Sequence, residues 1–520
     1  MLQLSLGRQH RSFIILIPLV AAAYLHFWNL SGFPDMIYDE GIYIRRALHV
    51  MAGLGPQEGS FNDHPYFGQL FLAGILASIN YPQSLHPTGT PESIASLFTI
   101  PRAIMGILAI IDTFLVFRIT QLRYDNLAIS LLAGILFAVM PSTWLARRVL
   151  LDGILLPFLL TSLLFALYAG RTKKANTTVF LIVGSGIMLG IAIFTKIPAF
   201  VMIPLVGYAV LKIRPVGKRT DIWSVSKKRR AIWLVPVIAI PMIWPIYTAV
   251  SGHFSDWMKD VITQSSLKND AIIAMWLPFS RIDPVLFALG VAGLAYTAIR
   301  RDFLPLLWFI PFTVFFFVVG YHQYFYVLPI VPALCIAASK MLFDAITLLR
   351  SKSPRISRTG VALVPIVAIV GFGLVNTAIL INTDMTSAQV QAAVFGLDYY
   401  ESHGSITLAA SPAYSWIYPY VFQIHGMLKD YGDIRYYNTD TTNILLFVDT
   451  HFTSDFTQNH LLTKVYNNTH TVAYFNGTIP RYDLSTYPYT NLEFNREGAF
   501  VDMRDGSAAV LSPNGIFRNP

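Results

Sequence analysis

Two neighbouring carboxylates, Asp39 and Glu40, follow the first long apolar stretch of the chain, and Asp63-His64 lies a short distance further on. A carboxylate at a membrane surface meets both water and lipid headgroups, and it can take a proton from a reacting hydroxyl group. Residues 37–51 have the pattern of an amphipathic helix on the membrane surface, whose dipole would favour ionised carboxylates at its N-terminus. The sequence therefore predicts a reaction site at a membrane face.

Four further ionisable residues, Arg147, Arg148, Asp152 and Lys196, occur in short turns between apolar segments. Charge close to hydrocarbon is costly, so each of these residues needs a partner. One interpretation is that the cations bind an anionic group at the outer leaflet. The other is that they pair with Asp152, with Asp39 or with lipid phosphates and only anchor the helices. The residues alone leave both interpretations open.

The composition places the chain among membrane proteins with many spans. Hydrophobic residues make up 54% of its 520 residues and charged residues only 13%, which a soluble globular protein of this length would not show. The single cysteine, Cys335, lies in an apolar run. The sequence therefore offers neither a disulfide framework nor a cluster of cysteines for zinc.

Apolar stretches of about 17 to 25 residues predict about eleven membrane-spanning helices. The stretch 65–81 is also apolar but starts with a proline after His64, so we expect a second interfacial or re-entrant helix there. The long outer segment 251–282 is a candidate lid over the site. The expected spans are 12–30, 94–117, 127–144, 153–169, 178–194, 197–212, 231–250, 283–299, 303–320, 324–346 and 360–381.

Basic residues indicate the orientation of these spans. More than half of the 38 Lys and Arg fall in alternate connecting segments, which are cytoplasmic if the N-terminus is cytoplasmic. With an odd number of spans, residues 382–520 are then extracytoplasmic, and we expect the first span to be an uncleaved signal anchor. The net charge of +9 follows from this topology, so nucleic-acid binding is not needed to explain it.

Residues 1–381 and 382–520 differ in character, and we interpret them as a transmembrane catalytic domain and an extracytoplasmic soluble α/β domain. In the second, the apolar runs 406–410 and 444–448 have the length of strands, and 387–402 has helical spacing. The predicted fold class is therefore mostly α, a polytopic helical bundle followed by a small α/β domain.

The order of several motifs resembles that of the dolichyl-phosphate-mannose protein mannosyltransferases and is similar to that of the aminoarabinose transferases, two groups with the GT-C fold. The resemblance covers about residues 10–210 and continues in an aromatic, basic motif before a later helix. The motifs are Asp39-Glu40, Asp63-His64-Pro65, Arg148-Val149-Leu150-Leu151-Asp152, Gly190-Ile191-Ala192-Ile193-Phe194-Thr195-Lys196 and Tyr321-His322-Gln323-Tyr324-Phe325-Tyr326.

The resemblance implies transfer of a sugar, with mannose as one candidate, from a polyprenyl-phosphate donor to a protein, lipid or glycan acceptor. It implies a single displacement that inverts the anomeric centre, with Asp39 as the base and Glu40 orienting acceptor or sugar. The other residues that it implicates are Arg148, Lys196 and Arg147 for the donor phosphate, and His64, Asp152, His322 and Tyr324 for further substrate contacts.

Two other functions stay open at the level of the sequence. An oligosaccharyltransferase has a comparable layout, and Asp430-Tyr431-Gly432 matches part of its tryptophan-rich signature, although the tryptophans are missing. A transporter would also place charges among helices, but it should show paired halves and charges near mid-membrane. The expected chemistry requires no cofactor; a divalent cation shared by Asp39 and Glu40 is an open alternative.

Overall fold

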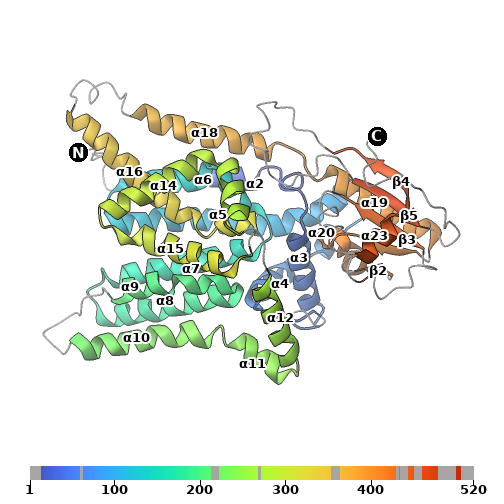
Figure 1. Cartoon of the computed structure of the whole chain (residues 1–520), viewed down its shortest axis with the longest axis horizontal. Helices are drawn as coiled ribbons and strands as arrows, with labels where there is room; N and C mark the ends of the chain where they lie inside the picture. Colours follow the sequence, from blue (N-terminus) through green and yellow to red (C-terminus); the bar gives the residue numbers. More distant parts are fainter. Residues whose placement is uncertain are drawn as a thin grey trace.

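The structure is a computed structural model, and Figure 1 shows a long bundle of helices with a small sheet at one end. His322 and the triplet 430–432, which the sequence singled out, lie outside the described residues. The structure describes residues 13–58, 62–211, 222–267, 271–321, 323–352, 363–404, 406–424, 426–428, 433, 443–449, 460–477 and 499–504.

The long apolar helices lie side by side in the bundle (Figure 1). Within the described ranges, five helices are long and apolar enough to cross a membrane, or up to eight spans if each of three bent helix pairs crosses once. Shorter apolar helices occupy other expected spans, so a total of about eleven stays a prediction. The bundle helices are α2 (Leu16–Phe27), α5 (Pro91–Tyr124), α6 (Leu127–Val139), α7 (Leu151–Ala169), α8 (Ala175–Thr195), α9 (Ile203–Leu211), α10 (Ile222–Ala239), α11 (Ile243–Val250), α13 (Ala271–Ile282), α14 (Pro284–Ile299), α15 (Phe303–Val319), α16 (Val331–Lys352) and α18 (Val364–Ile381).

Local signals set where these helices begin, and small residues set how closely they pack. α5 starts at Pro91 because the preceding Thr90 caps the helix, its side chain accepting a hydrogen bond from the backbone N–H of Ser93. Gly293 of α14 lies against α16, where an added side-chain carbon would be 2.5 Å from the backbone carbon of Ala337. Close backbone contact of this kind is typical of helices that pack in a membrane.

Short helices lie between the bundle and the sheet (Figure 1). The helix expected over 37–51 is present as α3, and the one expected within 65–81 is α4, whose 12 residues are too short to cross a hydrocarbon layer of about 30 Å. The expected lid segment is helical, and Asp260 in it accepts a hydrogen bond from the backbone N–H of Asn62. The short elements are α3 (Tyr38–Met51), α4 (Phe67–Ser78), α12 (Phe254–Ser266) and the 3-10 turns η1 (Gln83–Leu85), η2 (Pro141–Arg147), η3 (Ile197–Met202) and η4 (Tyr324–Val327).

The C-terminal part contains a five-stranded sheet with the strand order β2-β1-β3-β5-β4. β1 pairs in parallel with β2 and β3, whereas β5 pairs antiparallel with β3 and β4. The strands predicted at 406–410 and 444–448 are confirmed as β1 and β3, and the helix predicted at 387–402 is α19. The elements are α19 (Ser387–His403), β1 (Thr407–Ala409), α20 (Pro412–Ser415), α21 (Ile417–Val421), β2 (Met427–Leu428), β3 (Ile444–Val448), α23 (His460–Tyr466), β4 (His470–Phe475) and β5 (Ala499–Arg504).

The C-terminal part forms hydrogen bonds with the segment that leads into α3. Gln389 of α19 accepts a hydrogen bond from the backbone N–H of Met36 at 2.9 Å and donates one back to the Met36 carbonyl at 3.0 Å. The Thr386 hydroxyl donates to the carbonyl of Ser31. One continuous hydrophobic core contains residues from both sides of the proposed boundary at 381/382, and the division into two domains stays a prediction.

Candidate active site

α3 carries Asp39 and Glu40 in its first turn, after Ile37 in an extended conformation. Neighbouring residues on an α-helix point about 100° apart, so the two carboxylates face different surroundings. The helix is fixed from behind by α20, because a side-chain carbon at Gly41 would lie only 1.9 Å from the carbonyl oxygen of Pro412. The C-terminal part of the chain thereby sets the direction in which both carboxylates point.

Glu40 is fully buried in a group of arginines. Its two carboxylate oxygens accept hydrogen bonds from Nε and Nη2 of Arg102 at 2.8 and 2.9 Å, a bidentate pair. Nη1 of Arg148 lies 3.6 Å from the same carboxylate, and the backbone N–H of Val149 donates to it at 3.3 Å. Glu40 therefore holds α3 against α5 and against the turn before α7, and its contacts are with the protein itself.

Arg148 and Arg147 are also buried. Arg148 donates to the side chain and, at 2.7 Å, to the carbonyl of Asp35, and its guanidinium lies 5.0 Å from the ring centroid of Trp144. Arg147 donates to the carbonyl of Trp28. The closed cluster consists of Asp35, Glu40, Arg102 and Arg148. Its two carboxylates pair with its two guanidinium groups, and this pairing compensates the cost of burying the charges.

Asp39 faces the other way, is only half buried, and forms no hydrogen bond or salt bridge with a described residue. Burial raises the pKa of its carboxyl group to about 6; Lys196 opposes this shift, whereas the carboxylates of Asp152 and Asp63 add to it. An acid with a pKa near the working pH and with accessible oxygens is suited to proton transfer. Asp39 therefore has the accessibility that Glu40 lacks.

A buried cation lies close to Asp39. Lys196 follows the end of α8, and its ammonium group is 2.6 Å from a carboxylate oxygen of Asp152 in the first turn of α7. The same ammonium group lies 4.0 Å from the ring centroid of Tyr326, in cation–π contact. The lysine is thus buried and paired, and it interacts electrostatically with Asp39.

A second pair of charges borders this space. Arg46 of α3 is 2.8 Å from Asp63. Burial would raise the pKa of that carboxyl group, but Arg46, His64 and hydrogen bonds together lower it to about 2. Burial lowers the pKa of His64 to about 4, with Asp63 opposing the shift and Lys196 and Arg46 adding to it. At neutral pH the histidine is therefore uncharged, whereas Asp63 is ionised. The open cluster consists of Asp39, Arg46, Asp63, His64, Asp152, Lys196 and Tyr326.

The predicted site residues thus divide between the two clusters. Asp39, His64, Asp152 and Lys196 come together in the open cluster, while Glu40 and Arg148 belong to the closed one. Arg147 bonds to neither Asp39 nor Glu40 and donates instead to the carbonyl of Trp28. Tyr324 interacts electrostatically with Arg148. His322 is outside the described residues.

Sequence reasoning assigned no role to four residues that shape these clusters: Asp35, Arg46, Arg102 and Tyr326. Arg102 carries a usable signal, because a lone arginine inside an apolar span needs a carboxylate partner. Asp35 precedes α3 in an irregular segment, so nothing in its pattern distinguishes it. Tyr326 belongs to an aromatic run in which the sequence cannot tell which ring meets a cation.

Among the described residues, no group of three or more His, Cys, Asp or Glu side chains is arranged to hold a metal ion. The sequence left open a cation shared by Asp39 and Glu40, and in the structure both carboxylate oxygens of Glu40 bond to Arg102. A divalent cation shared by the two carboxylates stays an alternative from the sequence.

Comparison with known proteins indicates the class of enzyme. The family model described as dolichyl-phosphate-mannose-protein mannosyltransferase matches residues 17–256, a range that contains every described member of both clusters except Tyr326. No curated protein sequence matches the chain.

The fold is similar to that of two solved glycosyltransferases. One is the oligosaccharyltransferase of Archaeoglobus fulgidus in the apo form, with a TM-score of 0.56 and 13% identity over 92% of this chain and 75% of that one. The other is ArnT from Cupriavidus metallidurans bound to undecaprenyl phosphate, with a TM-score of 0.50 and 13% identity over 98% of this chain and all of the other. Such identities establish the fold, and the family match adds the class of activity: the chain is an integral membrane glycosyltransferase with the GT-C fold.

Proposed function

We propose that this protein transfers a sugar from a polyprenyl-phosphate donor to a hydroxyl acceptor, with Asp39 as the general base. The single observation that carries the proposal is the half-buried, unbonded carboxylate of Asp39 beside the buried Lys196. Support comes from ArnT, whose solved structure is bound to undecaprenyl phosphate, and from the archaeal oligosaccharyltransferase solved with a dolichol-phosphate. The mannosyltransferase family match supports mannose as the sugar.

The proposed reaction is a single displacement. The acceptor oxygen attacks the anomeric carbon while its proton passes to Asp39, and the bond between that carbon and the phosphate oxygen breaks with its electron pair going to the phosphate. Lys196 stabilises the negative charge that grows on the departing polyprenyl phosphate. Attack from the side opposite the phosphate inverts the anomeric centre. Because Lys196 is paired with Asp152 at 2.6 Å, the phosphate would share the lysine with this carboxylate or displace it.

The closed cluster has a positioning role in this proposal. Glu40 binds Arg102 and Arg148, and together they lock the first turn of α3, from which Asp39 projects. The resemblance implied that Glu40 orients substrate and that Arg148 and Arg147 bind phosphate. In the structure all three are buried, Glu40 and Arg148 are each paired with two charged side chains, and Lys196, which is also buried, is paired with one and interacts with Asp39. We therefore assign the phosphate contact to Lys196 first, with Arg46 and His64 as further contacts at the same space.

The acceptor is a protein, a lipid or a glycan, and the reaction takes place at the extracytoplasmic face in the orientation that the basic residues predict. A second candidate is transfer of an oligosaccharide to protein, which is favoured by the similarity to the archaeal oligosaccharyltransferase over 92% of this chain. Both candidates use Asp39 and Lys196 in the same roles, and they differ in the size of the transferred group.

The test uses the purified full chain in detergent with a synthetic polyprenyl-phosphate mannose and a membrane extract as the source of acceptors. We expect release of polyprenyl phosphate together with labelled product, and loss of both in Asp39→Asn. A lipid-linked oligosaccharide offered in parallel distinguishes the second candidate. Turnover of neither donor by folded, monodisperse protein, with acceptor extract present, would overturn the proposal of a polyprenyl-linked donor.

A further inference from the structure

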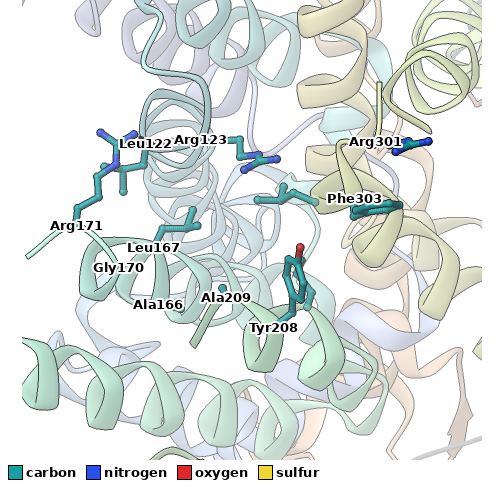
Figure 2. Close-up of a pocket in the computed structure, with 12 residues that line it drawn as sticks. Leu122, Arg123, Ala166, Leu167, Gly170, Arg171, Tyr208, Ala209, Arg301 and Phe303 are labelled. Carbon is teal, nitrogen blue, oxygen red and sulfur yellow. Dashed lines mark hydrogen bonds between the residues drawn. The ribbon is translucent and has the colours of Figure 1, made fainter. Parts of the chain in front are cut away.

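A cavity of about 310 Å³ opens between α5, α7, α9 and α15, far from both clusters. Three exposed arginines, Arg123, Arg171 and Arg301, lie at its mouth, and apolar side chains such as Leu167 and Phe303 line it beside them. In Figure 2 the guanidinium of Arg123 and the ring of Tyr208 point toward the same central space, with Arg171 on one side and Arg301 on the other. The cavity thus combines cationic side chains with apolar ones.

The spacing of residues along α5 gives the distance between this cavity and the candidate active site. Arg102, which binds Glu40, and Arg123, which lines the cavity, are both on α5 and are 123 − 102 = 21 residues apart. At 1.5 Å per residue this is about 30 Å, which is about the thickness of the hydrocarbon layer of a bilayer. The cavity therefore lies at the membrane face opposite the open cluster, the face that the sequence predicts to be cytoplasmic.

The charges at the mouth do not cancel within the protein. Arg123 pairs with Asp302 at 2.7 Å, and Arg171 is 3.8 Å from the exposed Asp125. Arg301 is exposed and forms no ion pair with a described residue. Three arginines thus meet two carboxylates, one of which is turned to solvent, and an anion at the mouth would complete the balance.

The backbone conformation of Arg301 is unusual for a residue other than glycine. Its φ of 57° is left-handed, a conformation that glycine usually provides just after a helix. This residue turns the chain from α14 into α15 and places its side chain at the cavity entrance (Figure 2). Arginine is sterically less favourable than glycine in this conformation, so what arginine adds at this position is its side chain.

We propose that this cavity binds the phosphate of an anionic phospholipid, with an acyl chain along its apolar wall. The location at one membrane face, the excess of arginine at the mouth and the apolar walls together fit a lipid headgroup better than a free anion, which would leave the walls in contact with water. Arginine-rich pockets between membrane helices suit such headgroups, and each cation near an anionic membrane surface contributes about 1 kcal/mol. The site is separate from sugar transfer, and its test needs no enzymatic activity.

The experiment measures lipid binding to the delipidated full chain in detergent by native mass spectrometry and by thermal unfolding. Phosphatidylglycerol should bind as one retained molecule and raise the unfolding temperature. Phosphatidylcholine with the same acyl chains and inorganic phosphate should do so much less. Equal binding of phosphatidylcholine, or equal stabilisation by inorganic phosphate, would overturn the assignment to an anionic lipid, as would displacement of the bound phosphatidylglycerol by polyprenyl phosphate.

Single variants locate the binding. Arg301→Gln and Arg171→Gln should each weaken phosphatidylglycerol binding about fivefold, the factor that corresponds to one surface cation. The matched control is Arg300→Gln, since Arg300 is adjacent in sequence, contacts the ring of Tyr296 and does not line the cavity. Wild-type affinity in both cavity variants, or an equal loss in the control, would show that the lipid binds elsewhere.

Discussion

Two carboxylates that are adjacent in the chain occupy opposite kinds of surroundings. Glu40 lies in the closed cluster, where two arginines and a backbone N–H satisfy its oxygens. Asp39 lies in the open cluster, where its oxygens bond to no described residue and Lys196, which interacts with it, is already paired with Asp152. Saturation of hydrogen bonds gives a charge a structural role, and incomplete saturation leaves it free to exchange protons.

The difference also explains how one membrane face can be both rigid and reactive. A buried ion pair stabilises little overall, but breaking it is costly because the remaining charge has no water to solvate it. The closed cluster therefore fixes geometry, while the open cluster supplies the groups that change protonation or partner. Variants of matched shape in each cluster should separate these two kinds of loss.

Asp39→Asn should have the largest effect. A positioned base contributes about 10²–10⁴-fold to the rate, so kcat for sugar transfer should fall by that factor while the unfolding temperature and donor binding stay close to wild type. Turnover and donor affinity are measured on monodisperse protein, with Asp398→Asn as the control, because Asp398 is exposed on α19. A variant that retained normal turnover would remove Asp39 from the mechanism.

Glu40→Gln should show the opposite pattern, with loss of stability ahead of loss of chemistry. The change leaves Arg102 and Arg148 buried without their shared carboxylate, and breaking a buried pair costs about 3–5 kcal/mol. Denaturant unfolding in detergent measures the difference from Asp39→Asn. If both variants unfolded alike, the contrast between the closed and open clusters would not hold.

Lys196→Gln should lower kcat by about 10²–10³, as removal of one group that stabilises developing negative charge does elsewhere. Lys196→Arg should recover part of the rate, since it keeps the charge at a different geometry. Steady-state kinetics with a polyprenyl-phosphate sugar make the measurement, and the exposed Lys173→Gln is the control. Normal rates in Lys196→Gln would leave the lysine with an anchoring role only, as the sequence allowed.

The smallest effect is that of pH. Burial raises the pKa of Asp39 to about 6, and a general base acts only when deprotonated. Below this pH, kcat/KM should therefore fall about tenfold per pH unit, and it should level off above it. His64, with a pKa of about 4, would place a fall in acid near pH 4 instead, so the position of the limb distinguishes the two groups.

Much of the open cluster was accessible from the sequence, because charged residues near hydrocarbon attract attention whatever the fold. Asp39, Asp152 and Lys196 were found in this way, and the structure brings them together. The role of Glu40 was not accessible, since the side of α3 that faces inward depends on contacts with α5 and α20.

The same limit applies to the fold. The strands at 406–410 and 444–448 were visible as short apolar runs, because β1 and β3 are buried throughout. Their order in the sheet, and the antiparallel pairing of β3 with β5, depend on partners distant in sequence. The segment expected as a lid forms two helices, at 254–266 and 271–282, of which the second belongs to the bundle, and the role as a lid stays a prediction.

The contact between Met36 and Gln389 joins residues 353 positions apart, and α20 covers Gly41 from an even later part of the chain. A ribosome adds about 5–20 residues per second, so α3 waits on the order of 20–70 s for the residues that orient it. The active site is therefore incomplete until the C-terminal part has been synthesised, and catalytic competence is acquired last. Its activity would report on completed synthesis: a chain truncated after Ile381 should enter the membrane and fail to turn over donor.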